Sequence, residues 1–258
     1  MKIKSKMSDI WQACEGASHL KIIAGDAYRL VESQEQVATL NFVSSREEQS
    51  LLEDMLETTK PSHSEDLELH YLLKTPFRYP PLRWGSRFGS TFEPSLFYGA
   101  SNIETTLSES AYYRSIFFLS MLGDAPKNVI RTEHTLFSAQ YRAENGIKLQ
   151  DPPFSEYESQ LTDPEIYRQT QSLGSAMRNA QVQAFQYRSS RARSSSDAIC
   201  VGIFSPSAIS SKIPQNETQW LCETTKDIVS FKHAANSKVH QFFVEGFLVG
   251  GKLPFAAD

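Results

Sequence analysis

Apolar residues recur at helical spacing in three parts of the chain, each preceded by a helix-start signal. The first predicted helix covers residues 46–58 and follows a capping box at 45–48. The second follows a capping box at 101–104 and runs to about residue 122, and the third runs from about 162 to 181. The second helix is apolar nearly all round, so we expect it to be buried.

Apolar runs bounded by polar turns predict strands around these helices. The expected strands are residues 95–100, 128–142, 184–187 and 198–204, with further short strands within 216–254, including 239–249. Because these strands do not alternate regularly with helices, the pattern favours an α+β fold over a doubly wound α/β fold.

The segment before residue 75 has a different pattern. Residues 26–43 predict short mixed elements, and a polar loop at 62–66 follows the first helix. Prolines at 76, 80 and 81 predict an extended segment after it. We therefore expect an N-terminal extension of residues 1–70 and a main domain of residues 71–258.

Composition narrows the class of protein. The formal net charge of −4 over 258 residues gives no overall basic character, so we expect no direct contact with nucleic acid. Three widely spaced cysteines without a Cys-x-x-Cys pair predict neither disulfides nor a cysteine-based zinc site, which suits a reducing cytoplasm. No apolar run has the length of a signal peptide core or a membrane span, so we expect a cytoplasmic protein without membrane contact.

Common catalytic motifs are absent. The six histidines show no metal-ligand spacing, and no P-loop, dinucleotide-binding or Gly-x-Ser-x-Gly pattern occurs. Cys200 lies in an apolar strand and is expected to pack rather than to react. Glu109 stands out, because a carboxylate among tyrosines on an apolar helix costs stability unless it is paired. By itself, Glu109 is better explained as a half-exposed glutamate or one that a tyrosine hydroxyl satisfies, because structural pairs also produce such glutamates. Arg87, flanked by Trp, Phe and Gly residues, is likewise explained as an arginine that braces a loop.

The order and spacing of the conspicuous residues resemble the RES domain family. Arg87-Phe88-Gly89 is followed by Tyr98 eleven residues after Arg87, and Glu109 comes eleven residues after that. Residues 75–114 resemble the longer-chain branch of the family. Residues 187–191 with the strand at 199–204 resemble its serine motif. The likeness covers about residues 70–235, and the upstream segment 29–35 also fits that branch.

The resemblance implies a mixed fold similar to ADP-ribosyltransferase toxins, with a central β core flanked by helices. It implies an enzyme that cleaves NAD⁺ as an NAD⁺ phosphorylase or glycohydrolase, with inorganic phosphate or water as acceptor and no metal or further cofactor. The implied catalytic residues are Arg87, Tyr98, Glu109 and Ser189, and the implied substrate-binding residues are Arg83, Phe88, Tyr187 and Arg191. Ser190 and Ser207 remain alternatives to Ser189 as the family serine.

These residue types suit that chemistry. Arg87 can grip phosphate oxygens as a bidentate fork, and the ring of Tyr98 can stack on nicotinamide or its ribose. Glu109 can stabilise the positive charge that develops on the ribose, and Ser189 can orient nicotinamide or a phosphate group. Nicotinamide leaves as a neutral molecule, so no strong general acid is required.

The resemblance also implies the toxin of a bacterial type II toxin–antitoxin pair, with a helical Xre-type antitoxin as partner; a homodimer is left open. Two rival functions share these residues. One is an ADP-ribosyltransferase that modifies a macromolecule. The other is a non-catalytic interaction protein that uses the helix at 46–58 as a partner surface.

Overall fold

A computed structural model of the protein describes residues 9–33, 45, 47–48, 51–52, 55, 68–79, 81, 83–121, 128–192 and 197–255. The helices are α1 (Ile10–Ala13), α3 (Tyr71–Arg78), α4 (Ile103–Leu119), α5 (Glu158–Leu161) and α6 (Arg168–Asn179). The strands are β1 (Lys21–Glu32), β2 (Phe97–Ala100), β3 (Ile130–Lys148), β4 (Ala184–Arg188), β5 (Ile199–Ile203), β6 (Gln215–Thr224), β7 (Ile228–His233) and β8 (Val239–Phe243). No helix within these described ranges is long and apolar enough to cross a membrane.

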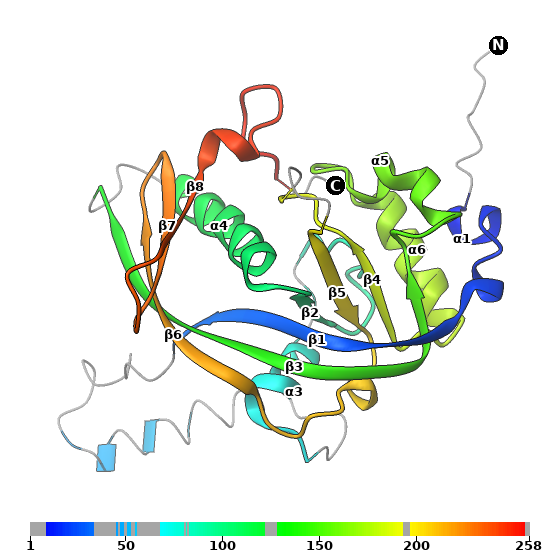
Figure 1. Cartoon of the computed structure of the whole chain (residues 1–258), viewed down its shortest axis with the longest axis horizontal. Helices are drawn as coiled ribbons and strands as arrows, with labels where there is room; N and C mark the ends of the chain where they lie inside the picture. The colour runs from blue at the N-terminus through cyan, green and yellow to red at the C-terminus, as the bar shows by residue number, and fades with distance from the viewer. Residues whose placement is uncertain are drawn as a thin grey trace.

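The strands form one sheet in the order β1-β2-β5-β4-β3-β6-β7-β8. β1 also pairs with β3, so β1, β2, β5, β4 and β3 close into a ring from which β6, β7 and β8 continue. Figure 1 shows β1 and β3 as two long strands side by side, with α4 between β7 on one side and β2 and β5 on the other. The arrangement confirms the α+β class, with a central sheet and flanking helices.

The central sheet contains residues from both sides of the domain boundary that we expected at residue 70. β1 lies inside the predicted extension, yet it pairs along its length with β3 and meets β2 at Tyr28 and Ala100. Residues 21–32 are therefore part of the central sheet, and the short mixed elements expected from residue 26 are one long strand up to Glu32. The predicted helix at 46–58 lies mostly outside the described residues. At its start, Glu48 N donates to Ser45 Oγ at 3.1 Å, as the capping box predicts.

The segment that the prolines predicted to be extended begins as a helix, since α3 runs to Arg78. Pro81 lies after this helix, and Pro80 lies outside the described residues. Pro76 lies inside α3, where it removes only one backbone donor of a two-turn helix. His70 caps this helix, since its Nδ1 accepts from Leu72 N at 3.4 Å. Leu73, fully buried, then packs into the core of the ring.

Two other helices begin later than predicted. α4 is capped by Asn102, whose Oδ1 accepts from Thr105 N at 2.8 Å, rather than by the first residue of the predicted capping box. α6 begins at Arg168 instead of about residue 162, because Asp163 Oδ1 accepts the backbone N–H groups of Glu165 and Ile166 in a separate turn. The predicted strand at 239–249 ends at Phe243, where a short 3₁₀ helix follows.

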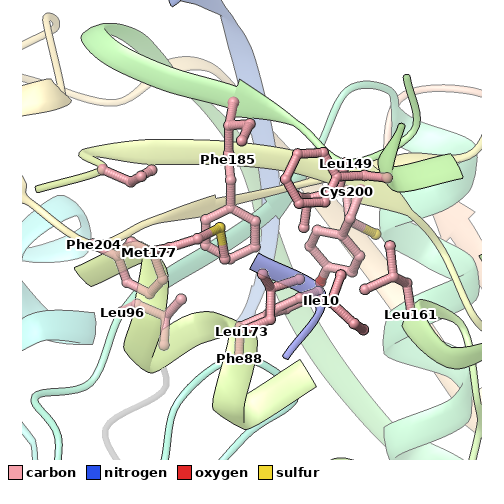
Figure 2. Close-up of a cluster of buried hydrophobic side chains, with 14 of the residues drawn as sticks. Ile10, Phe88, Leu96, Leu149, Leu161, Leu173, Met177, Phe185, Cys200 and Phe204 are labelled. Atoms are coloured by element: carbon pink, nitrogen blue, oxygen red, sulfur yellow. The ribbon is translucent and has the colours of Figure 1, made fainter. Parts of the chain in front are cut away.

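Three apolar clusters hold the molecule together. One fills the ring with side chains of β1 to β5, among them several alanines. A second packs α4 against β6 and β7. The third, drawn in Figure 2, joins α1, α5 and α6 to β4 and β5; its labelled members are Ile10, Phe88, Leu96, Leu149, Leu161, Leu173, Met177, Phe185, Cys200 and Phe204.

Candidate active site

A cavity of about 320 Å³ opens where α4 crosses β1, β2 and β5. Its wall brings together residues far apart in the chain, among them Arg29, Arg87, Tyr98, Glu109, Ser190 and Arg191. Of the eight predicted site residues, Arg87, Tyr98, Glu109, Tyr187 and Arg191 line this cavity. The ring and α4 therefore place a carboxylate, several guanidinium groups and several tyrosines around one space.

Arg87 lies at the tip of a tight turn, in which Ser86 N donates to Gly89 O at 2.7 Å. Helix α6 approaches this turn closely at Gly174, where a Cβ atom would lie 2.1 Å from the carbonyl oxygen of Phe88. A larger residue at 174 would push α6 away from the turn. The turn sends the side chain of Phe88 into the core and that of Arg87 into the cavity wall.

The buried guanidinium group of Arg87 is held by three protein oxygens. Its Nη1 donates to the carbonyl oxygens of Leu161 at 3.2 Å and Asp163 at 2.7 Å. Its Nη2 donates to Ser190 Oγ at 2.7 Å, and its Cζ lies 4.5 Å from the centre of the Tyr167 ring. Arg87 thus ties the connection between α5 and α6 to the loop after β4.

Tyr98 projects from β2 with its hydroxyl group engaged by the Arg87 turn. The hydroxyl lies 2.9 Å from Ser86 Oγ and accepts from Phe88 N at 3.0 Å. Burial raises the pKa of Tyr98 to about 12, so the phenol keeps its proton near neutral pH. Its ring, rather than its hydroxyl, is what the cavity offers to a ligand.

Glu109 on α4 is paired with a serine rather than with a tyrosine. Ser189 Oγ donates to Glu109 Oε1 at 2.5 Å. The same hydroxyl oxygen accepts from Arg191 N at 3.1 Å and Ala192 N at 3.0 Å. Ser189 therefore acts on the carboxylate, and it is the neighbouring Ser190 that lines the cavity.

Arg191 is buried over the face of Tyr112, with its Cζ 3.5 Å from the ring centre. Its Nη2 donates to Pro164 O and to the Tyr167 hydroxyl, each at 3.0 Å. Its Nη1 is buried and has no hydrogen-bond partner among the described residues. A buried guanidinium nitrogen without a partner is a natural contact for an anionic ligand group.

Arg29 is a lining residue that the sequence did not single out as a site residue. It lies on β1, donates from Nη1 to the carbonyl oxygen of Tyr98 at 2.8 Å, and lines both this cavity and a smaller neighbouring one. Burial lowers its pKa to about 10, so it is charged at neutral pH. The signal for it was the upstream likeness at 29–35, which by itself assigns no role.

The remaining predicted residues lie elsewhere. Arg83 is exposed and does not line the cavity, and Phe88 is fully buried in the core. Ser207 follows β5 and pairs with Ser205, away from the cavity. Cys200 packs in the core as predicted, but it also lines the cavity. The described ranges contain no group of three or more His, Cys, Asp or Glu side chains that could hold a metal ion.

The fold and site define an α+β protein with a carboxylate and several arginines around one cavity. A family model described as the RES domain matches residues 64–223. This match spans more than half of the chain, so the chain belongs to the RES domain family. No curated protein matches it. Among solved structures, a chain of the M. tuberculosis MbcT–MbcA toxin–antitoxin complex is similar at 11% identity and a TM-score of 0.45, covering 85% of this chain and 93% of that one.

Proposed function

We propose that this protein degrades NAD⁺ by cleaving the bond between nicotinamide and ribose, with inorganic phosphate or water as acceptor. The observation that carries the proposal is Glu109, a carboxylate on the wall of a cavity that is also lined by three arginines and several tyrosines. The hydrogen bonds described for it engage Oε1, which leaves Oε2 for a ribose hydroxyl or for the charge that develops on the sugar.

The Glu109 carboxylate supplies the negative charge that cleavage of the N-glycosidic bond requires. As the N-glycosidic bond breaks, positive charge builds on the ribose ring, and a fixed negative charge nearby stabilises the transition state. The leaving nicotinamide is neutral, so no proton donor has to be placed beside it. The phosphate or water that attacks the sugar completes the transfer.

The arginines of the cavity wall favour a substrate that carries negative charge. We assign the phosphate groups of NAD⁺ to Arg29 and to the free Nη1 of Arg191. Arg87, which the sequence favoured for this role, already donates to two carbonyl oxygens and to Ser190. Its role in the proposal is to hold Ser190 and the turn before α6 in place around the substrate.

We assign the binding of nicotinamide and its ribose to tyrosine rings of the cavity wall. Tyr98 and Tyr187 both line the cavity, and the hydroxyl of Tyr98 is turned into the Arg87 turn, which leaves its ring for stacking. Stacking on an aromatic ring favours a planar cationic ring such as nicotinamide in NAD⁺.

The test is NAD⁺ loss by the purified protein, with and without inorganic phosphate, beside Glu109→Gln. We expect wild type to consume NAD⁺ and Glu109→Gln to lose at least about 100-fold in rate, since electrostatic stabilisation of a transition state contributes on that scale. Glu104→Gln is the matched control, because Glu104 lies at the exposed start of the same helix and pairs with His240 outside the cavity. Phosphate dependence separates phosphorolysis from hydrolysis.

Two results would contradict the proposal. No NAD⁺ loss under either condition would favour the non-catalytic interaction protein. Labelled ADP-ribose found on protein or nucleic acid, rather than free in solution, would favour a macromolecule ADP-ribosyltransferase.

In the cell, we propose that the protein is the toxin of a type II toxin–antitoxin pair whose antitoxin is of the Xre type. Family membership supports this assignment. Induced expression of wild type in a bacterial host should deplete NAD⁺ and stop growth, while Glu109→Gln should do neither. Growth arrest by both proteins would separate the effect from NAD⁺ chemistry.

A further inference from the structure

A thiol group shares the carboxylate oxygen that Ser189 holds. Cys200 lies on β5, opposite Tyr187 of β4 and Ala100 of β2, and its side chain is buried in the cavity wall. Its Sγ lies 3.6 Å from Glu109 Oε1, within hydrogen-bond distance for sulfur. The same oxygen of Glu109 thus receives one donor from the loop after β4 and one from β5.

The thiol is a donor here rather than a nucleophile. Burial, followed by the charge of Glu109, raises the pKa of Cys200 well above its usual value, so the group keeps its proton. The hydroxyl groups of Tyr187 and Ser189 act on the pKa of Cys200 in the opposite direction, but the effect of burial is larger. A protonated thiol can donate, and the Glu109 carboxylate accepts from it.

We propose that Cys200 is a positioning residue for Glu109: its thiol and the Ser189 hydroxyl together hold one carboxylate oxygen and so orient the other toward the substrate. The inference rests on the proposed NAD⁺ cleavage. Neither the helical pattern around Glu109 nor the apolar strand around Cys200 links the two, since the contact depends on how α4 packs across β5.

Positioning of this kind should affect the transition state more than the bound substrate. A glutamate side chain has several rotatable bonds, and fixing it before reaction removes the cost of ordering it during the chemical step. A carboxylate that stabilises developing charge contributes little to ground-state binding. Loss of one of its two anchors is therefore expected to lower kcat and to leave KM nearly unchanged.

The experiment compares Cys200→Ala and Cys200→Ser with wild type in steady-state NAD⁺ turnover. Cys222→Ala is the matched control, because Cys222 is equally buried on a strand and contacts a hydroxyl group, that of Thr224, away from the cavity. We expect Cys200→Ala to lower kcat about fivefold with KM within about twofold of wild type, which is the scale of one modest hydrogen bond. Cys200→Ser keeps a donor and should recover at least half of the lost kcat, while Cys222→Ala should keep the wild-type kcat.

A second measurement tests the contact without turnover. In a double-mutant cycle of Cys200→Ala and Glu109→Ala followed by urea unfolding, the shifts in midpoint should be non-additive, because each substitution removes one partner of the direct contact. Additive midpoints, or a folded Cys200→Ala with wild-type kcat, would overturn the inference while leaving NAD⁺ cleavage intact. A wild-type protein without NAD⁺ turnover would instead overturn the proposed function and, with it, this role for Cys200.

Discussion

At the scale of single residues, the two adjacent serines after β4 have different neighbours. The Ser189 hydroxyl accepts hydrogen bonds from two backbone N–H groups and donates one to Glu109, so its hydrogen-bonding capacity is used within the protein. The Ser190 hydroxyl accepts from Arg87 and lines the cavity. We therefore expect Ser189 to hold the Glu109 carboxylate in place and Ser190 to contact the bound substrate.

Alanine substitutions separate these two roles. Ser189→Ala leaves Glu109 Oε1 without its short bond, so kcat for NAD⁺ should fall about tenfold, the effect of losing a charge-assisted hydrogen bond. Ser190→Ala should mainly raise KM, because it changes the cavity wall while Glu109 keeps its bond from Ser189. Steady-state kinetics on both variants provide the measurement. The reverse pattern, with the larger kcat loss in Ser190→Ala, would place Ser190 at the reacting centre.

At the scale of elements, the start of α6 is set in part by a contact between distant segments, which a local pattern does not contain. The predicted third helix would use the carbonyl oxygen of Asp163 early in its own hydrogen bonding. In the structure that oxygen accepts from Arg87, and the Asp163 side chain holds a turn of its own. α6 therefore begins only at Arg168, and the segment before it serves the site.

The start of α4 gives a direct test of a cap. Asn102 accepts from Thr105 N and also donates from Nδ2 to the carbonyl oxygen of Asp197 at 3.2 Å, so Asn102→Ala should lower the free energy of unfolding by about 1 kcal/mol. Ser101→Ala is the control, since its backbone N–H, which donates to Ile199 O, is kept. Urea unfolding of both variants measures the difference. A larger loss of unfolding free energy in Ser101→Ala would mean that Ser101 is the N-cap, as the sequence pattern predicted.

At the scale of the whole molecule, β1 closes the ring by pairing with β2 and β3. Its alternation places Ala27 in the core with no exposed surface, while Ala24 on the same strand is exposed. The same strand carries Arg29 to the cavity. Stability of the ring and completeness of the site therefore depend on one strand near the N-terminus.

A matched pair of substitutions on β1 measures that dependence. Ala27→Asp buries a carboxylate without a partner, so the free energy of unfolding should fall by more than about 3 kcal/mol or the protein should fail to fold. Ala24→Asp on the exposed face should change it by less than about 0.5 kcal/mol. Circular dichroism and urea unfolding are sufficient readouts. Equal stability of the two variants would mean that residues 21–32 are peripheral, as an N-terminal extension would be.

Local periodicity was sufficient to predict many of the helices and strands. Strands such as β4 and β5 and the helix α4 follow from apolar runs and spacing, because burial on one face or on both sets those patterns directly. The order of Arg87, Tyr98 and Glu109 likewise indicated the family before the structure placed them around one cavity. These features depend on residues close together in the chain.

Only the tertiary structure decided which groups complete the site. The pairing of Tyr28 with Ala100 brings Arg29 beside Tyr98, and the packing of α4 across β5 brings Cys200 to Glu109. The distinction between Ser189 and Ser190 depends on the same packing. By itself, the sequence determined the elements and the candidate carboxylate, because short-range spacing encodes both. The partners of that carboxylate depended on contacts between segments tens of residues apart, which no local pattern specifies.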